Sequence, residues 1–172
     1  MSQRRKLIFS WTLVVLWAGV IFFMSAHTGS DFDGAGPLAT IKRWLISLAA
    51  PVFGPETDIV NVAAHFTEYL VFGILLLLAL RQTDATRIDR NGSVPAIGAK
   101  GEFSVARRRT NPWLLLAVAV VLASLYAVTD EFHQSFVPGR MCDPADWLTD
   151  TLGAMLGAAV AAIALRGPGE ES

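Results

Sequence analysis

The sequence predicts an all-α polytopic membrane protein, in which four transmembrane helices form a bundle and a short amphipathic helix lies on the outer face. The first observation is the distribution of apolar residues, because their overall share of 53% is only slightly above that of a soluble domain. They occur in four long runs, and the charged residues gather between the runs. The second observation is length, since a helix needs roughly 20 apolar residues to cross the hydrocarbon core.

Each run is predicted as one span of a single domain that covers residues 1–172. The first run carries no charged side chain and is too long for a signal-peptide core of about 7–15 apolar residues, so we expect it to be retained. The second run has the length of a span but includes His65 and Glu68. The predicted spans lie at about 7–26, 59–80, 112–130 and 146–165.

Positive charge predicts which side each loop faces, because cytoplasmic loops of membrane proteins hold an excess of Lys and Arg. Arg4, Arg5 and Lys6 precede the first span, and segment 81–111 contains seven basic residues. The loop between spans one and two contains two basic residues and four acidic ones. We therefore expect a multi-pass protein of the bacterial cytoplasmic (inner) membrane with both termini in the cytoplasm.

Two segments between the spans differ in pattern. Residues 83–110 are rich in Gly, Arg, Asp and Ser and lack periodicity, which predicts a mobile cytoplasmic loop within segment 81–111. Segment 37–50 instead repeats apolar residues at helical spacing, which predicts a short amphipathic helix in the outer interface. A lid packed over the bundle is the alternative for this helix. Its apolar residues are Leu38, Ile41, Trp44, Leu45 and Leu48, with Lys42 and Arg43 between them.

Polar side chains lie at the outer ends of three predicted spans, at spacings that place them on one helix face. A charge in the hydrocarbon costs roughly 2.5–3.5 kcal/mol, so such residues face one another or a water-filled cavity and indicate a functional site. The alternative is a set of helix ends wetted by the interface. The three sets are Asn61, His65, Glu68 and Tyr69; Tyr126, Asp130, His133 and Gln134; and Asp146 with Asp150.

Some neighbouring residues have simpler explanations. Asp143, followed by Pro144, has the pattern of an N-cap with proline at the first helical position. Gly153 and Gly157 form a small-xxx-small pair, which favours close helix packing over chemistry. Arg140 is suited to bind phosphate or carboxylate through forked hydrogen bonds, and a salt bridge with Asp143 or Asp146 is the alternative.

Carboxylates beside imidazoles can exchange protons, which makes these residues candidates for acid–base chemistry. The candidate catalytic residues are His65, Glu68, Tyr69, Glu131, Gln134, Asp146 and Asp150. The candidate substrate-binding residues are Arg140, Asn61, Asp130 and His133.

No metal and no cofactor is predicted, because the chain has no established ligand signature. Two residue pairs would still place two metal ligands on one helix face: His65 with Glu68, and Asp130 with His133. The single cysteine excludes an intrachain disulfide framework. The chain also lacks a basic patch with interleaved aromatic residues, so nucleic acid is not an expected partner.

The stretch 130–140, followed by Asp146 and by Asp150 through Gly153, resembles the signature of the VanZ-like family. That signature has an acid, two residues, Gln, then Phe, a Pro-Gly-Arg turn, an Asp that opens the last helix and a Gly-rich span. Three further residues, Asn61, His65 and Tyr69, are similar to the family's other motif, a His and a Tyr one turn apart in an earlier span. Members often carry Asn in place of Asp150, and many carry Lys near Asn61.

The resemblance implies an integral membrane protein of the cell envelope that is linked to resistance to teicoplanin-type lipoglycopeptides. It does not imply a particular reaction, and the residues leave open whether the chain is an enzyme. The first hypothesis is a protein that acts on or binds a lipid or lipid-linked anionic substrate at the outer leaflet. The second is a non-enzymatic resistance protein that binds lipid or antibiotic. The third is a proton-coupled transporter, which the absence of an inverted repeat disfavours.

Overall fold

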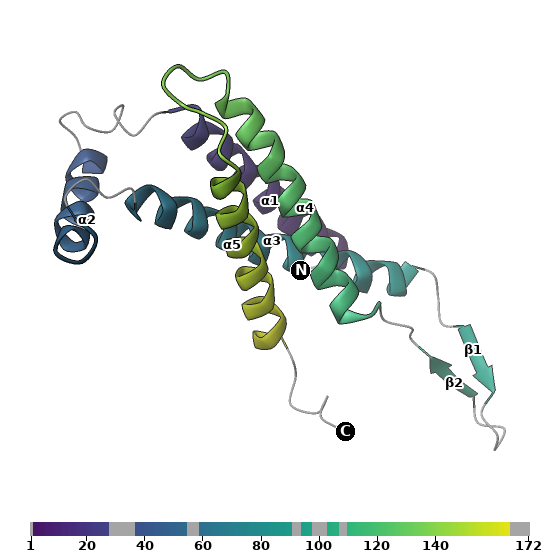
Figure 1. Cartoon of the computed structure of the whole chain (residues 1–172). Coiled ribbons are helices and arrows are strands. Elements are labelled where there is room, and N and C mark those ends of the chain that lie inside the picture. The colour runs from purple at the N-terminus through teal and green to yellow at the C-terminus, as the bar shows by residue number, and fades with distance from the viewer. Residues whose placement is uncertain are drawn as a thin grey trace.

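The structure is a computed structural model that describes residues 2–27, 37–54, 59–90, 94–97, 103–106 and 110–165 (Figure 1). Within these residues the chain forms five helices and one pair of short strands. The helices are α1 (Gln3–Ser25), α2 (Pro37–Phe53), α3 (Ile59–Arg90), α4 (Pro112–Gln134) and α5 (Pro144–Ala164), and the strands are β1 (Val94–Ile97) and β2 (Phe103–Ala106).

Four of these helices, α1, α3, α4 and α5, are long and apolar enough to cross a membrane. The N-terminal ends of α4 and α5 carry capping residues that follow the sequence signals. Asn111 and Asp143 each accept a hydrogen bond from a backbone N–H of the first turn, and a proline occupies the first position of both helices. Such a side chain replaces a hydrogen bond that the helix itself does not supply at its N-terminus. The predicted fold class, a bundle of four apolar helices, is confirmed.

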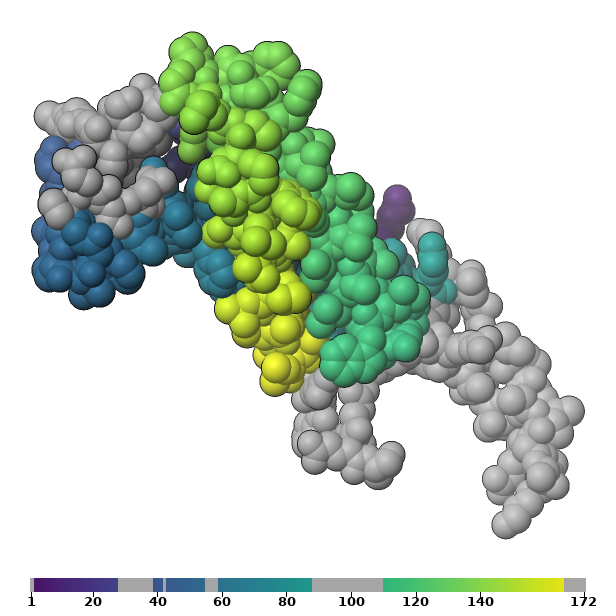
Figure 2. Space-filling model, viewed as in Figure 1, coloured from purple at the N-terminus to yellow at the C-terminus, as the bar shows by residue number. Residues whose placement is uncertain are grey.

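Helix α3 is the central helix of the bundle, because it packs against α1, α4 and α5. It crosses behind α5 and α4 at a steep angle, whereas α4 and α5 lie beside each other and form one continuous face (Figures 1 and 2). The interior contains Phe72, Leu76 and Leu77 of α3 together with small side chains of α4 and α5. Large apolar side chains such as Phe9, Leu125 and Ile163 point outward, as expected of a surface that faces lipid.

Glycines bring the backbones of α3 and α5 into direct contact. A methyl group at Gly157 would collide with the carbonyl oxygen of Leu70, and one at Gly153 would collide with the carbonyl oxygen of Phe66. On the facing helix, Gly73 lies against the backbone of α5 in the same way. The packing role predicted for the two glycines of α5 is therefore confirmed, since only a residue without a side chain permits this approach.

The predicted irregular loop at 83–110 is wrong in part. Helix α3 continues through Arg90, ten residues beyond the predicted end of the span at residue 80, and β1 and β2 then pair as an antiparallel hairpin. Segment 81–90 contains no Gly or Pro, so no helix-breaking residue interrupts α3 where it extends past its apolar part. The side chain of Asp84 accepts hydrogen bonds from the backbone N–H and the hydroxyl of Thr110, which connects the end of α3 to the start of α4.

Helix α2 is the predicted amphipathic helix, and it extends to Phe53, three residues beyond the prediction. It contacts α3 and otherwise lies apart from the bundle (Figure 1). Its large apolar side chains, including Ile41, Trp44 and Leu48, are exposed. This exposure disfavours the lid, because a lid would bury the apolar face against the bundle.

We predict that Gly157→Ala destabilises the protein by about 1–3 kcal/mol, because the added methyl group forces α3 and α5 apart. The measurement is the unfolding of detergent-solubilised protein, followed by circular dichroism. Gly19→Ala is the matched control, since a methyl group at Gly19 on α1 meets no other atom within 4 Å. Equal stability of the two variants would contradict a backbone contact at this crossing.

Candidate functional site

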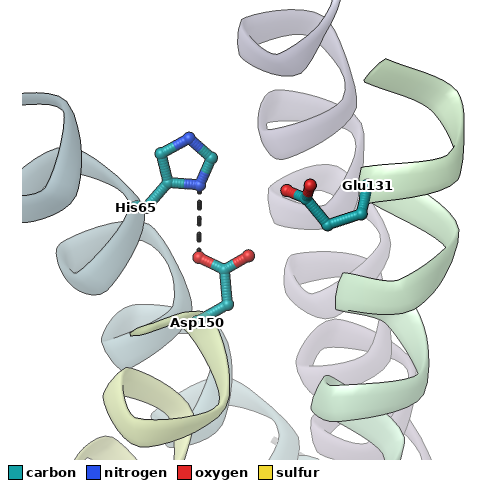
Figure 3. Close-up of side chains that lie close together, drawn as sticks. All are labelled: His65, Glu131 and Asp150. Atoms are coloured by element: carbon teal, nitrogen blue, oxygen red, sulfur yellow. Dashed lines mark hydrogen bonds and ion pairs between the residues drawn. The ribbon is translucent and has the colours of Figure 1, made fainter. Parts of the chain in front are cut away.

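Three helices each contribute one buried ionisable side chain to a common cluster (Figure 3). His65 comes from α3, Glu131 from α4 and Asp150 from α5, and all three side chains point toward the same space. One ligand-type atom from each residue lies within 4.8 Å of the other two. These residues are separated by up to 85 positions in the sequence, so only the helix packing brings them together.

The contact between α3 and α5 is a hydrogen-bonded pair of side chains. His65 Nδ1 lies 3.2 Å from Asp150 Oδ1, and Asp150 is fully buried. A carboxylate that is hydrogen-bonded to an imidazole nitrogen fixes the orientation of the ring. The other carboxylate oxygen of Asp150, Oδ2, has no hydrogen-bond partner among the described residues.

Glu131 connects the cluster to the turn between α4 and α5. Its Oε2 accepts a hydrogen bond of 2.8 Å from the backbone N–H of Asp143, the residue that caps α5. Its Oε1 is buried and has no partner among the residues that the structure describes. One oxygen of Glu131 thus holds the loop, and the other is available to a ligand.

A second group of polar side chains lies beside the cluster, near the end of α1. Gln134 donates from Nε2 to Asp130 Oδ2 over 3.2 Å, and both side chains are buried. Ser25, in the last turn of α1, is also buried, and its hydroxyl has no hydrogen-bond partner among the described residues. His133 stacks on Phe22 of α1, with ring centroids 4.1 Å apart. Helix α4 continues through Gln134, four residues beyond the predicted end of span three at residue 130.

Arg140 contacts α1, and no ion pair with Asp143 or Asp146 is present within residues 110–165. Its guanidinium donates to the backbone carbonyl oxygens of Ser25 and His27, at 3.1 and 3.2 Å. These carbonyls are at the C-terminal end of α1, where a helix carries partial negative charge, so a cation is favourable there. The salt bridge considered for Arg140 is wrong, and the residue holds the α4–α5 turn against α1.

The other candidate residues differ in how closely they approach the cluster. Tyr69 is fully buried one turn along α3 from His65, and its hydroxyl has no partner among the described residues. Glu68 is half-buried and interacts electrostatically with His65, Asp130, Asp150 and Arg140. Asp146 is half-buried in the first turn of α5, near enough to interact with His65.

Asn61 is the candidate that the structure leaves outside the buried cluster, because its side chain is exposed near the start of α3. Two unpredicted residues instead belong to the surroundings of the site. The backbone carbonyl oxygen of Ser25 accepts a hydrogen bond from Arg140, and Trp17 donates from its indole nitrogen to the backbone carbonyl oxygen of Glu68, over 2.9 Å. The signal for Ser25 was a polar residue near the end of an apolar run, but its partner was not visible from the sequence.

This arrangement can support two kinds of chemistry. Carboxylates and an imidazole in contact can transfer protons to or from a bound group. The same atoms can bind a cation, because His65, Glu131 and Asp150 offer one nitrogen and two oxygens to a common space. The sequence suggested pairs of metal ligands on one helix, His65 with Glu68 and Asp130 with His133. The structure does not bring either pair together as the three-residue group. The buried cluster takes one residue from each of three helices.

Comparison with known proteins gives one match. The model of the family described as VanZ/LLP1 matches residues 9–165, which include all four long apolar helices almost completely. No curated protein and no solved structure matches the chain.

We expect His65 and Asp150 to be energetically coupled, because each leaves the other without its hydrogen-bond partner when it is replaced. A double-mutant cycle with His65→Ala and Asp150→Ala should give a coupling energy of about 0.5–3 kcal/mol, measured by unfolding in detergent with a chelator present. The matched control is a cycle of His133→Ala with Asp150→Ala, two residues that share no hydrogen bond in the structure. Strict additivity in the first cycle would refute the pair.

Proposed function

The chain belongs to the VanZ/LLP1 family of membrane proteins, and from this premise we propose that it acts on or binds a lipid or lipid-linked anionic substrate at the outer leaflet. The proposal includes a link to glycopeptide resistance of the teicoplanin type. The observation that carries it is the cluster of His65, Glu131 and Asp150, buried together in a bundle whose outer surface is apolar.

Burying these ionisable groups has a large energetic cost, so a protein keeps them where they serve a function. An ionisable residue within a transmembrane helix costs roughly 2.5–3.5 kcal/mol, and such residues mark substrate or ion sites. Two buried carboxylate oxygens of the cluster, Glu131 Oε1 and Asp150 Oδ2, have no partner among the described residues. A packed core would leave them unsatisfied at a cost of about 1–3 kcal/mol each, which favours a site that receives a ligand.

The charge distribution supports the outer leaflet. Gln3 of α1 and Gln82 of α3 are hydrogen-bonded, so the basic start of the chain and the basic end of α3 are at the same end of the bundle. The positive-inside rule assigns that end to the cytoplasm. His65 and Glu131 are at the opposite ends of their helices, which supports a site open to the outer side of the cytoplasmic membrane.

The chemistry of the site fits an acid–base reaction on a head group. Glu131 or Glu68 would act as the general acid or base, and His65 would exchange the proton with it. Arg140 is half-buried beside this region, and its guanidinium would attract a phosphate or carboxylate of the substrate.

A second candidate function is binding without catalysis, and helix α2 favours it. Its exposed apolar side chains next to a helix that carries the site give the protein a surface suited to the membrane interface. In this case the protein would occupy lipid, or exclude a lipoglycopeptide from its membrane target, and turnover would be absent.

If the protein is an enzyme, Glu131→Gln should lower turnover of a lipid in a bacterial lipid extract by about 100-fold or more, because the amide cannot exchange a proton. The assay compares the extract by mass spectrometry before and after incubation with purified protein in vesicles. Asp143→Asn is the control, since Asn also caps a helix and the side chain is exposed. An extract left equally unchanged by wild type and Glu131→Gln counts against catalysis on the lipids present.

If the binding function holds, Trp44→Ala should reduce teicoplanin resistance in cells more than Trp113→Ala does. The two tryptophans are similarly exposed, at 60% and 64%, but only Trp44 lies on α2. Minimum inhibitory concentrations are measured with protein levels in the membrane matched by immunoblot. Equal resistance in the two variants, combined with a steep loss in Asp146→Asn, would instead favour chemistry in the polar cluster.

A further inference from the structure

We propose that His65, Glu131 and Asp150 form a binding site for one divalent first-row transition metal ion, with Zn²⁺ as the first ion to test. This inference goes beyond the proposed function, since it is argued from the geometry and the charges of the cluster and its surroundings. It remains valid if the substrate is not a lipid. It also differs from the expectation from the sequence, which predicted no metal because the chain has no established ligand signature.

The distances fit the first coordination shell of such an ion. Zinc binds histidine nitrogen and carboxylate oxygen at about 2.0–2.2 Å with tetrahedral geometry, which places two neighbouring ligand atoms roughly 3.3 Å apart. His65 Nδ1 and Asp150 Oδ1 are separated by 3.2 Å. Glu131 offers the third ligand, because one ligand atom from each of the three residues lies within 4.8 Å of the other two (Figure 3).

The unpaired oxygens are an independent sign of a ligand. Asp150 is fully buried and Glu131 almost so, yet Asp150 Oδ2 and Glu131 Oε1 have no hydrogen-bond partner among the described residues. Buried polar atoms in native proteins are nearly always paired with protein or water. A cation between the two carboxylates would satisfy oxygens that no described donor reaches.

The balance of charge around the cluster also calls for a cation. Glu68, Asp130 and Asp146 interact electrostatically with the cluster, so acidic side chains outnumber the imidazoles of His65 and His133 in this part of the bundle. The nearby cation, Arg140, donates to the carbonyl oxygens of α1. Buried charges require opposite charge or metal coordination, and a divalent ion supplies two positive charges at the point where the acids converge.

The donor set selects the class of metal. Calcium and magnesium prefer shells made only of oxygen, whereas imidazole suits zinc and its first-row neighbours. Three protein ligands with an open fourth position are typical of a catalytic zinc site. Glu131 also has the support that such ligands need, because its second oxygen is held by the backbone N–H of Asp143.

The test is the zinc content of the full-length protein, purified in detergent on an affinity tag without histidine. Protein is stripped with a chelator, incubated with ZnCl₂, separated from free metal and analysed by mass spectrometry. We expect about one zinc per chain in wild type and in Asp143→Asn. Asp150→Asn and Glu131→Gln should lose at least about tenfold in zinc affinity, because each removes a charged ligand.

Asp143→Asn is the matched control, since it makes the same Asp-to-Asn change on the same connection but at an exposed cap. A second measurement uses wild type only, so it tests the proposal even if a variant does not fold. Wild type loaded with Co²⁺ should show visible absorption bands of a bound ion, and Zn²⁺ should raise its melting temperature.

Two results would overturn the proposal. One is a stripped wild-type protein that takes up no zinc and shows no visible cobalt bands. The other is equal zinc content in folded Asp150→Asn, Glu131→Gln and Asp143→Asn, which would mean adventitious binding elsewhere. Because no lipid is present, the metal site and the lipid function can fail separately.

Discussion

The backbone contact between α3 and α5 decides where the polar groups of this protein meet. Gly153 lies against the carbonyl oxygen of Phe66, the residue that follows His65, and Asp150 precedes Gly153 by one turn on the same helix. Because no side chain separates the two backbones, the helices approach until the imidazole of His65 reaches the carboxylate of Asp150. A glycine contact that looks purely structural therefore sets the geometry of the candidate site.

The hydrocarbon around the bundle imposes the second condition, because it offers no hydrogen-bond partner to a polar group. The polar side chains of three helices accordingly gather at one end of the bundle, and the connections there join the same network. Arg140 holds the α4–α5 turn to the carbonyl oxygens of Ser25 and His27, and Glu131 holds it through the N–H of Asp143. The turn is thus part of the site. The second carboxylate oxygen of Glu131, Oε1, is buried and has no partner among the described residues.

Much of the fold could be predicted from the sequence, and the candidate site only in part. The apolar runs and the cap at Asp143 locate the long helices, since length and end signals are local properties. Helix α3 continues through Arg90, beyond the predicted end of the span, because no Gly or Pro interrupts the chain after the apolar residues. Helical spacing correctly put His65 and Tyr69 on one face, but it also suggested metal pairs within single helices, which the packing does not assemble.

By itself, the sequence determined that this chain has four long apolar helices, an amphipathic helix and a set of polar faces, because hydrophobic length and periodicity are local properties of the sequence. The tertiary structure alone decided which polar faces meet. It joined His65, Glu131 and Asp150, left Asn61 exposed and turned Arg140 toward α1. The physical reason is that helix crossing angles and contact points arise from the packing of whole surfaces, above all at the glycines. Spacing along one helix contains no information about its neighbour.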